Sequence, residues 1–139
     1  MAPASKPPTD SRTDEGSPPD AARYLPVLLH QDARGTLAAF ERASLPFTPV
    51  RAFVILDVPA DAVRSGRILA CEEFIWAAAG SCEVTTLSNG IRHSVMLRDR
   101  RRGIYLPAGM AVELGSFAPG TVLLVLASKP YSASDEVSA

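Results

Sequence analysis

The sequence is poor in the residues that build metal sites and disulfide frameworks. It has two histidines and two cysteines in 139 residues. His30 and His93 lie far apart and have no acidic or cysteine neighbours at ligand spacing, whereas a metal site usually needs about three or four protein ligands. Cys71 and Cys82 are too few for a disulfide framework and form no C-x-x-C pair. We therefore expect two buried, unpaired cysteines and a protein without a metal or other cofactor.

Strong net charge and long apolar runs are absent as well. The formal net charge is −1 at pH 7, which argues against a long polyanion such as nucleic acid as the partner. No stretch approaches the roughly 20 apolar residues that a membrane span requires, and the first residues lack the apolar core of a secretory signal. These absences favour a soluble, cytoplasmic protein with neither nucleic acid nor a membrane as partner.

Large apolar side chains are nearly missing from the two ends of the chain. Residues 1–23 are rich in Pro, Ser, Asp and Thr, and they bury too little apolar surface to offset the entropy lost on ordering. They predict a disordered arm, and the polar residues 133–139 predict a flexible tail. Residues 24–132 are predicted to form one domain, which is large enough to bury a core without disulfides or metals.

What the sequence does contain is a series of short β-prone segments separated by turn signals. Segments at this spacing predict an all-β sandwich or barrel. Asn89-Gly90 lies between two of them and predicts a hairpin, since both central residues of a type I′ turn need a positive φ. The segments are residues 24–29, 35–41, 50–58, 84–87, 91–97, 103–106 and 121–127.

Several short blocks of the sequence occur in a characteristic order. They are Asp32-x-Arg34-Gly35-Thr36-Leu37, Ile55-Leu56-Asp57-Val58-Pro59, Gly80-Ser81-Cys82-Glu83-Val84, Gly103-Ile104-Tyr105-Leu106-Pro107, Glu113-Leu114 and residues 122–128. In this order they resemble the single-domain cupins that act as nucleotide-sugar 3,4-ketoisomerases and move the carbonyl of a dTDP-4-keto-6-deoxyhexose from C4 to C3. The resemblance implies a cupin-type, jelly-roll-like antiparallel β-barrel with the substrate in its interior, and a homodimer.

Residues 68–79 can be interpreted in two ways. Their leucine, glutamates and alanines are good helix formers, and their apolar spacing would serve a helix. In the resembled family, however, this segment is a central strand that enters a hairpin at the position of Gly80. Because tertiary context can override propensity, we predict a strand.

The chain departs from the family at the active-site histidines. The family carries His-Ala-His on a barrel strand, so that both imidazoles point into one cavity. Counting back from Gly80 places these histidines at Gly66 and Ile68. Counting forward from Arg64, with one deletion, places them at Arg67 and Leu69. Neither count recovers a histidine.

Two further family positions are acidic in this chain. The later Trp-His-Glu of the family falls on Ala111-Val112-Glu113, so only the glutamate is kept. The resemblance makes Glu113 a candidate contact for the substrate. The glutamine that follows the family's His-Ala-His strand falls on Glu73, or on the deleted residue.

Moving a carbonyl to the neighbouring carbon requires a base that removes the C3 proton, an enediol intermediate, and an acid that returns a proton at C4. Glu73 is the predicted base, because in a strand it would share one face with Cys71 and Ile75 and so point into the barrel. An outward, solvated glutamate is the alternative. Tyr105 is the second catalytic candidate, as a proton donor or a partner for a sugar hydroxyl; the alternative is a barrel aromatic with its hydroxyl at the rim.

Three arginines are candidates for holding the pyrophosphate of a nucleotide sugar. Arg34 and Arg64 stand at family positions, and Arg67 lies close by in the sequence. A guanidinium group can bind phosphate oxygens in a bidentate manner. The arginine-rich residues 98–102 are interpreted either as a phosphate grip or as a solvated turn between two strands.

Two functions therefore stay open. The first is a metal-independent sugar-nucleotide 3,4-ketoisomerase that acts on a dTDP-4-keto-6-deoxyglucose-type substrate in deoxysugar biosynthesis. The alternative is a catalytically impaired cupin that binds a nucleotide sugar or assists a partner enzyme. A metal-dependent cupin dioxygenase or isomerase lacks its ligands in this sequence.

Overall fold

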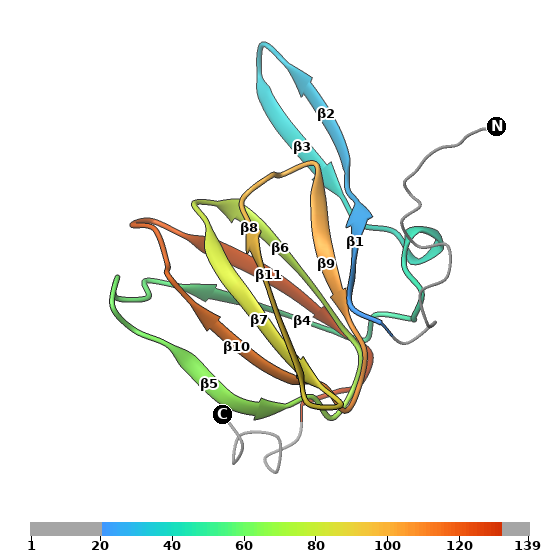
Figure 1. Cartoon of the computed structure of the whole chain (residues 1–139). Helices are drawn as coiled ribbons and strands as arrows, with labels where there is room; N and C mark the ends of the chain where they lie inside the picture. Colours follow the sequence, from blue (N-terminus) through green and yellow to red (C-terminus); the bar gives the residue numbers. More distant parts are fainter. Residues whose placement is uncertain (1–20, 132–139) are drawn as a thin grey trace, which may run out of the picture.

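The computed structural model describes residues 21–131, which are built almost entirely of strands (Figure 1). This part of the chain has eleven strands and one 3-10 helix. The elements are β1 (Arg23–Pro26), β2 (Leu28–Asp32), β3 (Gly35–Ala39), η1 (Arg42–Ser44), β4 (Arg51–Leu56), β5 (Arg64–Ile68), β6 (Glu73–Ala79), β7 (Cys82–Ser88), β8 (Ile91–Leu97), β9 (Arg102–Leu106), β10 (Ala111–Gly115) and β11 (Val122–Ala127). The predicted tail and most of the predicted arm lie outside the described residues; β1 begins at the arm's last residue.

Two antiparallel sheets face each other (Figure 1). One has the strand order β1-β9-β6-β11-β4, and the other has the order β5-β10-β7-β8. Strands β2 and β3 form a separate hairpin that projects beyond the two sheets. The pairs within all three sheets are antiparallel. The predicted all-β, antiparallel barrel is confirmed.

Side chains alternate between two apolar clusters on opposite faces of the five-stranded sheet. In β6, Ile75 belongs to the cluster between the two sheets, whereas Phe74 and Trp76 belong to a cluster on the outer face. This alternation is that of a strand with both faces covered. The base of the β2–β3 hairpin and the segment after η1 cover the outer cluster, which also includes Val27, Leu45, Phe47, Tyr105 and Leu126.

The strand predicted at residues 68–79 is confirmed, with a break in it. β5 ends at Ile68 and β6 begins at Glu73, so the segment contributes to both sheets. β6 is the central strand of its sheet and pairs with β9 on one side and β11 on the other. Backbone pairing on both sides and burial on both faces outweigh the helix propensity of its alanines.

The predicted hairpin at Asn89-Gly90 is also confirmed. The two residues have φ angles of 53° and 77°, and Ser88 pairs with Ile91 where β7 turns into β8. Both central residues thus adopt the left-handed conformation that a type I′ turn requires.

The edge strands β1 and β8, which belong to different sheets, lie beside each other. The Tyr24 hydroxyl of β1 donates a hydrogen bond of 3.1 Å to the carbonyl oxygen of Met96 in β8. This contact ties the two sheets together at one point along their open edge. Among residues 21–131, no helix has the length and apolarity to cross a membrane.

Candidate active site

The inner face of the four-stranded sheet carries a row of residues that we call the inner row. Strand register places Arg67 of β5 opposite Val112 of β10, and Val112 opposite Thr86 of β7. Thr86 is in turn opposite His93 of β8. Residues directly opposite each other on paired strands project on the same face. Because Val112 belongs to the core between the sheets, the four side chains of the inner row face the interior of the barrel.

Glu73 comes from the facing sheet and pairs with the first residue of the inner row. It lies on the same face of β6 as Ile75, inside the barrel, and is only 2% exposed. Arg67 Nη2 donates a hydrogen bond of 2.6 Å to Glu73 Oε2, and the Arg67 side chain is 19% exposed. A buried carboxylate is very costly without a cation or other partners. The ion pair therefore explains how Glu73 is accommodated among apolar side chains.

The side-chain directions in and just after β5 distinguish the two counts that place the family's histidines, either at Gly66 and Ile68 or at Arg67 and Leu69. Arg67 and Leu69 point into the barrel, since Arg67 reaches Glu73 and Leu69 belongs to the inner core. Ile68 is 62% exposed on the outer face. Only the count that places the histidines at Arg67 and Leu69 puts them inside the barrel. The two inward positions are thus held by a guanidinium and an aliphatic side chain.

A cavity of about 110 Å³ lies where β1 approaches β8. It is smaller than the roughly 300–1,000 Å³ of typical ligand pockets, so it has room for a sugar ring but not for a whole nucleotide sugar. The Tyr24 ring at its wall lies 4.0 Å under the Arg102 guanidinium. The cavity is lined by Ala22, Arg23, Tyr24, Val84, Thr86, His93, Val95 and Ile104.

Arg51 adds a second positive charge to the same end of the barrel. It lies opposite Ala127 of β11, and Ala127 lies opposite Glu73, so the Arg51 side chain is also on the inner face. Its guanidinium stacks 5.1 Å from the ring centre of Phe53 and 5.9 Å from that of Tyr131. Its Nε is buried without a hydrogen-bond partner. An anion entering this end of the barrel would supply that partner.

Tyr105, a predicted catalytic residue, lies on the other side of the five-stranded sheet from Glu73. It belongs to the outer apolar cluster and is 4% exposed. Its hydroxyl donates a hydrogen bond of 2.6 Å to Glu72 Oε2, and Arg23 stacks over its ring at 4.8 Å. The structure therefore does not bring Tyr105 and Glu73 together, because alternate strand residues point to opposite faces.

The three other predicted substrate contacts lie on separate surfaces. Arg34 is in the tip of the β2–β3 hairpin, where its side chain is 91% exposed and bonds Asp32 at 2.7 Å. That hydrogen bond is the main cause that lowers the pKa of Asp32 and raises that of Arg34. Arg64 is exposed at the start of β5. The hairpin follows the end of β1 that is farther from Glu73. Within a single chain, Arg34 therefore lies away from Glu73.

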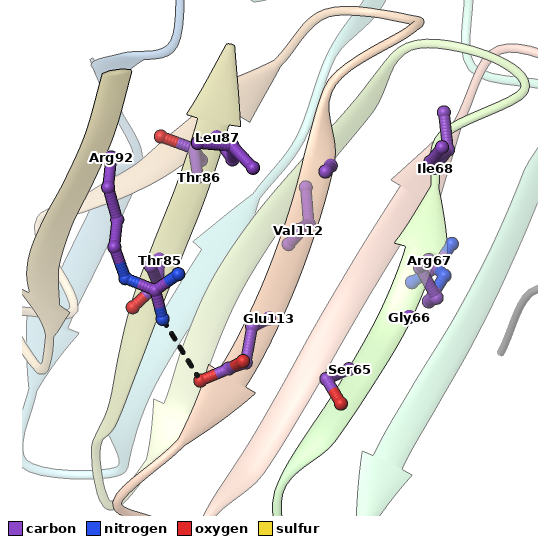
Figure 2. A pocket seen from close by; sticks show the side chains of 11 residues that line it. Ser65, Gly66, Arg67, Ile68, Thr85, Thr86, Leu87, Arg92, Val112 and Glu113 are labelled. Carbon is purple, nitrogen blue, oxygen red and sulfur yellow. Dashed lines mark ion pairs between the residues drawn. The ribbon is translucent and has the colours of Figure 1, made fainter. Parts of the chain in front are cut away.

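Glu113 points away from the barrel interior. It borders a groove of about 300 Å³ on the outer face of the four-stranded sheet, where Arg92 Nη2 lies 3.8 Å from its Oε2 (Figure 2). Ser65, Ile68, Thr85 and Leu87 border the same groove (Figure 2). The carboxylate of Glu113 is separated from Glu73 by the sheet itself.

The arginine-rich residues 98–102 form a turn rather than one converging cluster. Arg101 bonds both carboxylate oxygens of Asp99, and this lowers the pKa of Asp99 to about 2. The Arg100 carbonyl oxygen accepts a hydrogen bond of 2.8 Å from Trp76 Nε1, and Arg102 stacks on Tyr24. The alternative of a solvated turn fits this arrangement best.

The cysteines of the described chain are both buried and unpaired, as expected. Burial raises the pKa of the Cys82 thiol to about 11, so it stays protonated at neutral pH. Within residues 21–131, no group of three or more His, Cys, Asp or Glu side chains is arranged to hold a metal.

Four of the residues that line this end of the barrel were not predicted as site residues from the sequence: Tyr24, Arg51, Thr86 and His93. All four are on strands. A two-residue alternation tells which residues share a face, but it does not tell which strands are neighbours. The strand order is not visible in the sequence, so the sequence could not show that these four side chains lie at the same end of the barrel.

Comparison with known proteins agrees with the predicted fold and with the resemblance to 3,4-ketoisomerases. The family model described as FdtA: WxcM-like, C-terminal, matches residues 22–138. A TDP-4-oxo-6-deoxy-α-D-glucose-3,4-oxoisomerase from Aneurinibacillus thermoaerophilus is 28% identical over 108 residues, which cover 76% of this chain and 78% of that protein.

Solved structures show the same relationship. The WlaRB TDP-quinovose 3,4-ketoisomerase from Campylobacter jejuni is similar with a TM-score of 0.76 and 28% identity, over 82% of this chain and 89% of that one. The 3,4-ketoisomerase QdtA from Thermoanaerobacterium thermosaccharolyticum, in complex with TDP, is similar with a TM-score of 0.76 and 25% identity, over 82% and 85% of the two chains. The chain belongs to the FdtA family, WxcM-like, C-terminal.

Proposed function

We propose that this protein is a sugar-nucleotide 3,4-ketoisomerase that acts in deoxysugar biosynthesis. Its substrate is a dTDP-4-keto-6-deoxyglucose-type sugar, whose carbonyl moves from C4 to C3 by enediol tautomerisation inside the barrel. The observation that carries the proposal is a buried carboxylate, Glu73, paired with Arg67 at the end of a barrel whose relatives are 3,4-ketoisomerases and oxoisomerases.

Glu73 is the base that removes the C3 proton in this proposal, and Arg67 keeps the charge balanced. When the Glu73 carboxylate accepts the proton it becomes neutral, so the Arg67 guanidinium no longer has a negatively charged partner. The same step places a negative charge on the oxygen of the enediolate. The Arg67 guanidinium can pair with the Glu73 carboxylate before the step and with the enediolate oxygen after it. The negative charge therefore moves from Glu73 to the sugar while Arg67 keeps a partner.

Substrate binding is assigned first to the arginines inside the barrel. Arg51 and Arg67 are the cations of its inner face at the end where Glu73 lies. We further propose a cytoplasmic homodimer, in which Arg34 on the projecting hairpin would contact the substrate of the second copy. Arg64, exposed at the start of β5, is a further phosphate contact in this proposal, whereas Glu113 and Tyr105 point away from the barrel interior and are assigned no contact with the reacting sugar.

A catalytically impaired, nucleotide-sugar-binding protein is the second candidate. One observation favours it: Glu73 is 2% exposed and its carboxylate is engaged by Arg67, so a substrate reaches it only after local rearrangement. Such a protein would bind dTDP-sugars and assist another enzyme of the pathway without turning them over.

Incubation with dTDP-4-keto-6-deoxyglucose in heavy water separates the two candidates. We expect the product with its carbonyl at C3 to form, with deuterium at C4, and the activity to resist chelators. Glu73→Gln, which keeps the shape but cannot accept the proton, should lower kcat by about 10²- to 10⁴-fold. Tight binding without product or deuterium uptake would instead establish the binding-protein function.

A further inference from the structure

His93 lies in the barrel mouth, although neither family position contains it. The chain has two histidines. His30 is on β2 of the projecting hairpin, whereas His93 ends the inner row and lines the 110 Å³ cavity. Its imidazole is therefore the histidine side chain that a sugar in this cavity would meet.

The backbone around His93 is fixed by its neighbours. β8 pairs with β7 from Cys82 to Ser88 without a register shift. The hydroxyl of buried Thr86 donates a hydrogen bond of 3.4 Å to the His93 carbonyl oxygen. Val84 and Val95, one level deeper in the barrel, and Ile104 from the facing sheet form apolar walls beside the ring.

The other polar groups of the cavity are already engaged. The Tyr24 hydroxyl donates to Met96, and the Thr86 hydroxyl donates to His93 itself. The charged groups beside the cavity on β1 and β9 are cations: Arg23 lines it while its guanidinium stacks on Tyr105 at the outer face, and Arg102 covers the Tyr24 ring. Neither guanidinium exchanges a proton at neutral pH. Histidine, with an ordinary pKa of about 6.5, is the side chain suited to this task.

Given the proposed isomerase function, we propose that His93 is a catalytic residue that returns the proton to C4 of the sugar. Glu73 and His93 come from facing sheets, β6 and β8. Glu73 does not line the cavity, but it bonds Arg67 at the other end of the inner row, so a sugar ring seated beside His93 would reach the Glu73 carboxylate after the local rearrangement that its burial requires.

The proton balance of this step is complete. Glu73 takes the hydrogen of C3, and its electron pair forms the C3–C4 double bond of the enediolate. The hydroxyl proton on O3 passes to O4. The imidazolium of His93 then gives its proton to C4, the C3–O3 double bond forms, and the sugar leaves as the 3-ketone. Solvent carries a proton from Glu73 back to His93 before the next turnover.

The experiment is a comparison of His93→Gln with wild type and with His30→Gln, which changes the hairpin histidine. His93→Gln should lower kcat by about 10²- to 10⁴-fold, with a much smaller change in KM. His30→Gln should keep the wild-type rate. Added imidazole should restore part of the His93→Gln activity.

Deuterium exchange at C3 distinguishes this role from a structural one. In heavy water, His93→Gln should still exchange the C3 hydrogen within a few-fold of the wild-type rate while forming almost no product, because Glu73 still makes the enediolate. Glu73→Gln should lose both exchange and product. If His93→Gln forms product at the wild-type rate, or loses C3 exchange as fully as Glu73→Gln, the assignment is overturned. A wild-type protein that neither exchanges nor isomerises would instead refute the proposed isomerase function.

Discussion

At the residue scale, one end of the barrel interior is defined by an ion pair between the two sheets. The resemblance aligns Arg67 with a family histidine by the count forward from Arg64, and Glu73 with the family's glutamine by the count back from Gly80. A cation at the first position alone would be buried without a counter-charge. With both residues present, each charge of the pair is neutralised by the other.

Breaking the pair from one side should destabilise the fold more than removing it completely. Arg67→Met leaves the Glu73 carboxylate buried without its arginine, which costs about 3–5 kcal/mol for a buried pair. In the double variant Arg67→Met, Glu73→Met, no charge stays buried, and most of that loss should be recovered. Urea unfolding of the wild type, both single variants and the double variant measures the difference.

The comparison also has a clear negative outcome. If Arg67→Met unfolds at the same urea concentration as the wild type, the pair does not hold the carboxylate in the interior. If the double variant is as unstable as Arg67→Met, packing rather than charge explains the loss.

At the element scale, two glycines in left-handed conformations form the turns at either end of β7. Gly80 lies between β6 and β7 with a φ of 73°, and Gly90 lies between β7 and β8 with a φ of 77°. Their surroundings differ. A Cβ at Gly80 would overlap the backbone and side chain of Thr121, whereas a Cβ at Gly90 would meet nothing within 4 Å. Thr121 is itself held in place, because its hydroxyl donates to the Ala118 carbonyl oxygen and accepts from the Ser81 amide.

Alanine at these two glycines should therefore separate backbone strain from overlap. Gly90→Ala should cost about 1–2 kcal/mol, the ordinary penalty of a left-handed conformation for a residue with a Cβ. Gly80→Ala should cost that amount plus the displacement of Thr121, so we expect a clearly larger loss. Thermal and urea unfolding of both variants test this. Equal losses would show that the Thr121 segment moves aside freely.

At the scale of the whole molecule, the barrel and the hairpin present charge in different places. Arg51 and Arg67 face the barrel interior. Arg34 stands at the tip of the β2–β3 hairpin, which projects beyond the two sheets (Figure 1). An isolated two-stranded hairpin is only marginally stable in water, and Leu28 and Leu37 on this one are 53% and 58% exposed. These features suit an arm that contacts another copy of the chain.

Binding of dTDP should depend on the exposed arginines Arg34 and Arg64 as well as on the arginines inside the barrel. dTDP should raise the melting temperature of the protein, and Arg34→Ala or Arg64→Ala should weaken binding about tenfold or more, because a lost charge-assisted phosphate contact costs about 1.5–3 kcal/mol. Arg98→Ala, in the β8–β9 turn, is the matched control and should bind normally. Titration calorimetry gives the affinities, and light scattering gives the oligomeric state.

The outcomes assign the arginines separately. A loss of affinity in Arg34→Ala for a dimeric protein would place the hairpin at the site of the second copy. Unchanged affinity in Arg34→Ala and Arg64→Ala would leave Arg51 and Arg67 as the phosphate contacts. No shift in melting temperature at millimolar dTDP would contradict nucleotide-sugar recognition.

The sequence by itself determined the fold class, the hairpin at Asn89-Gly90 and the family. Each of these follows from local information: strand-length segments between turn residues, a dipeptide that accepts positive φ, and short blocks in a fixed order. The sequence also indicated that Glu73 would point inward, because strand alternation gives the relative facing of residues two apart.

The tertiary structure alone decided which inward residues meet. Arg67, Thr86 and Val112 are far apart in the chain and become neighbours only through the pairing of β5, β10 and β7. His93 joins this row across the β7–β8 hairpin. In the other sheet, the pairing of β9 with β6 placed Tyr105 on the opposite face from Glu73, and the course of β1 placed Arg34 away from Glu73. Alternation is a property of one strand, whereas the contents of a barrel depend on strand order and register, which arise from the packing of the whole chain.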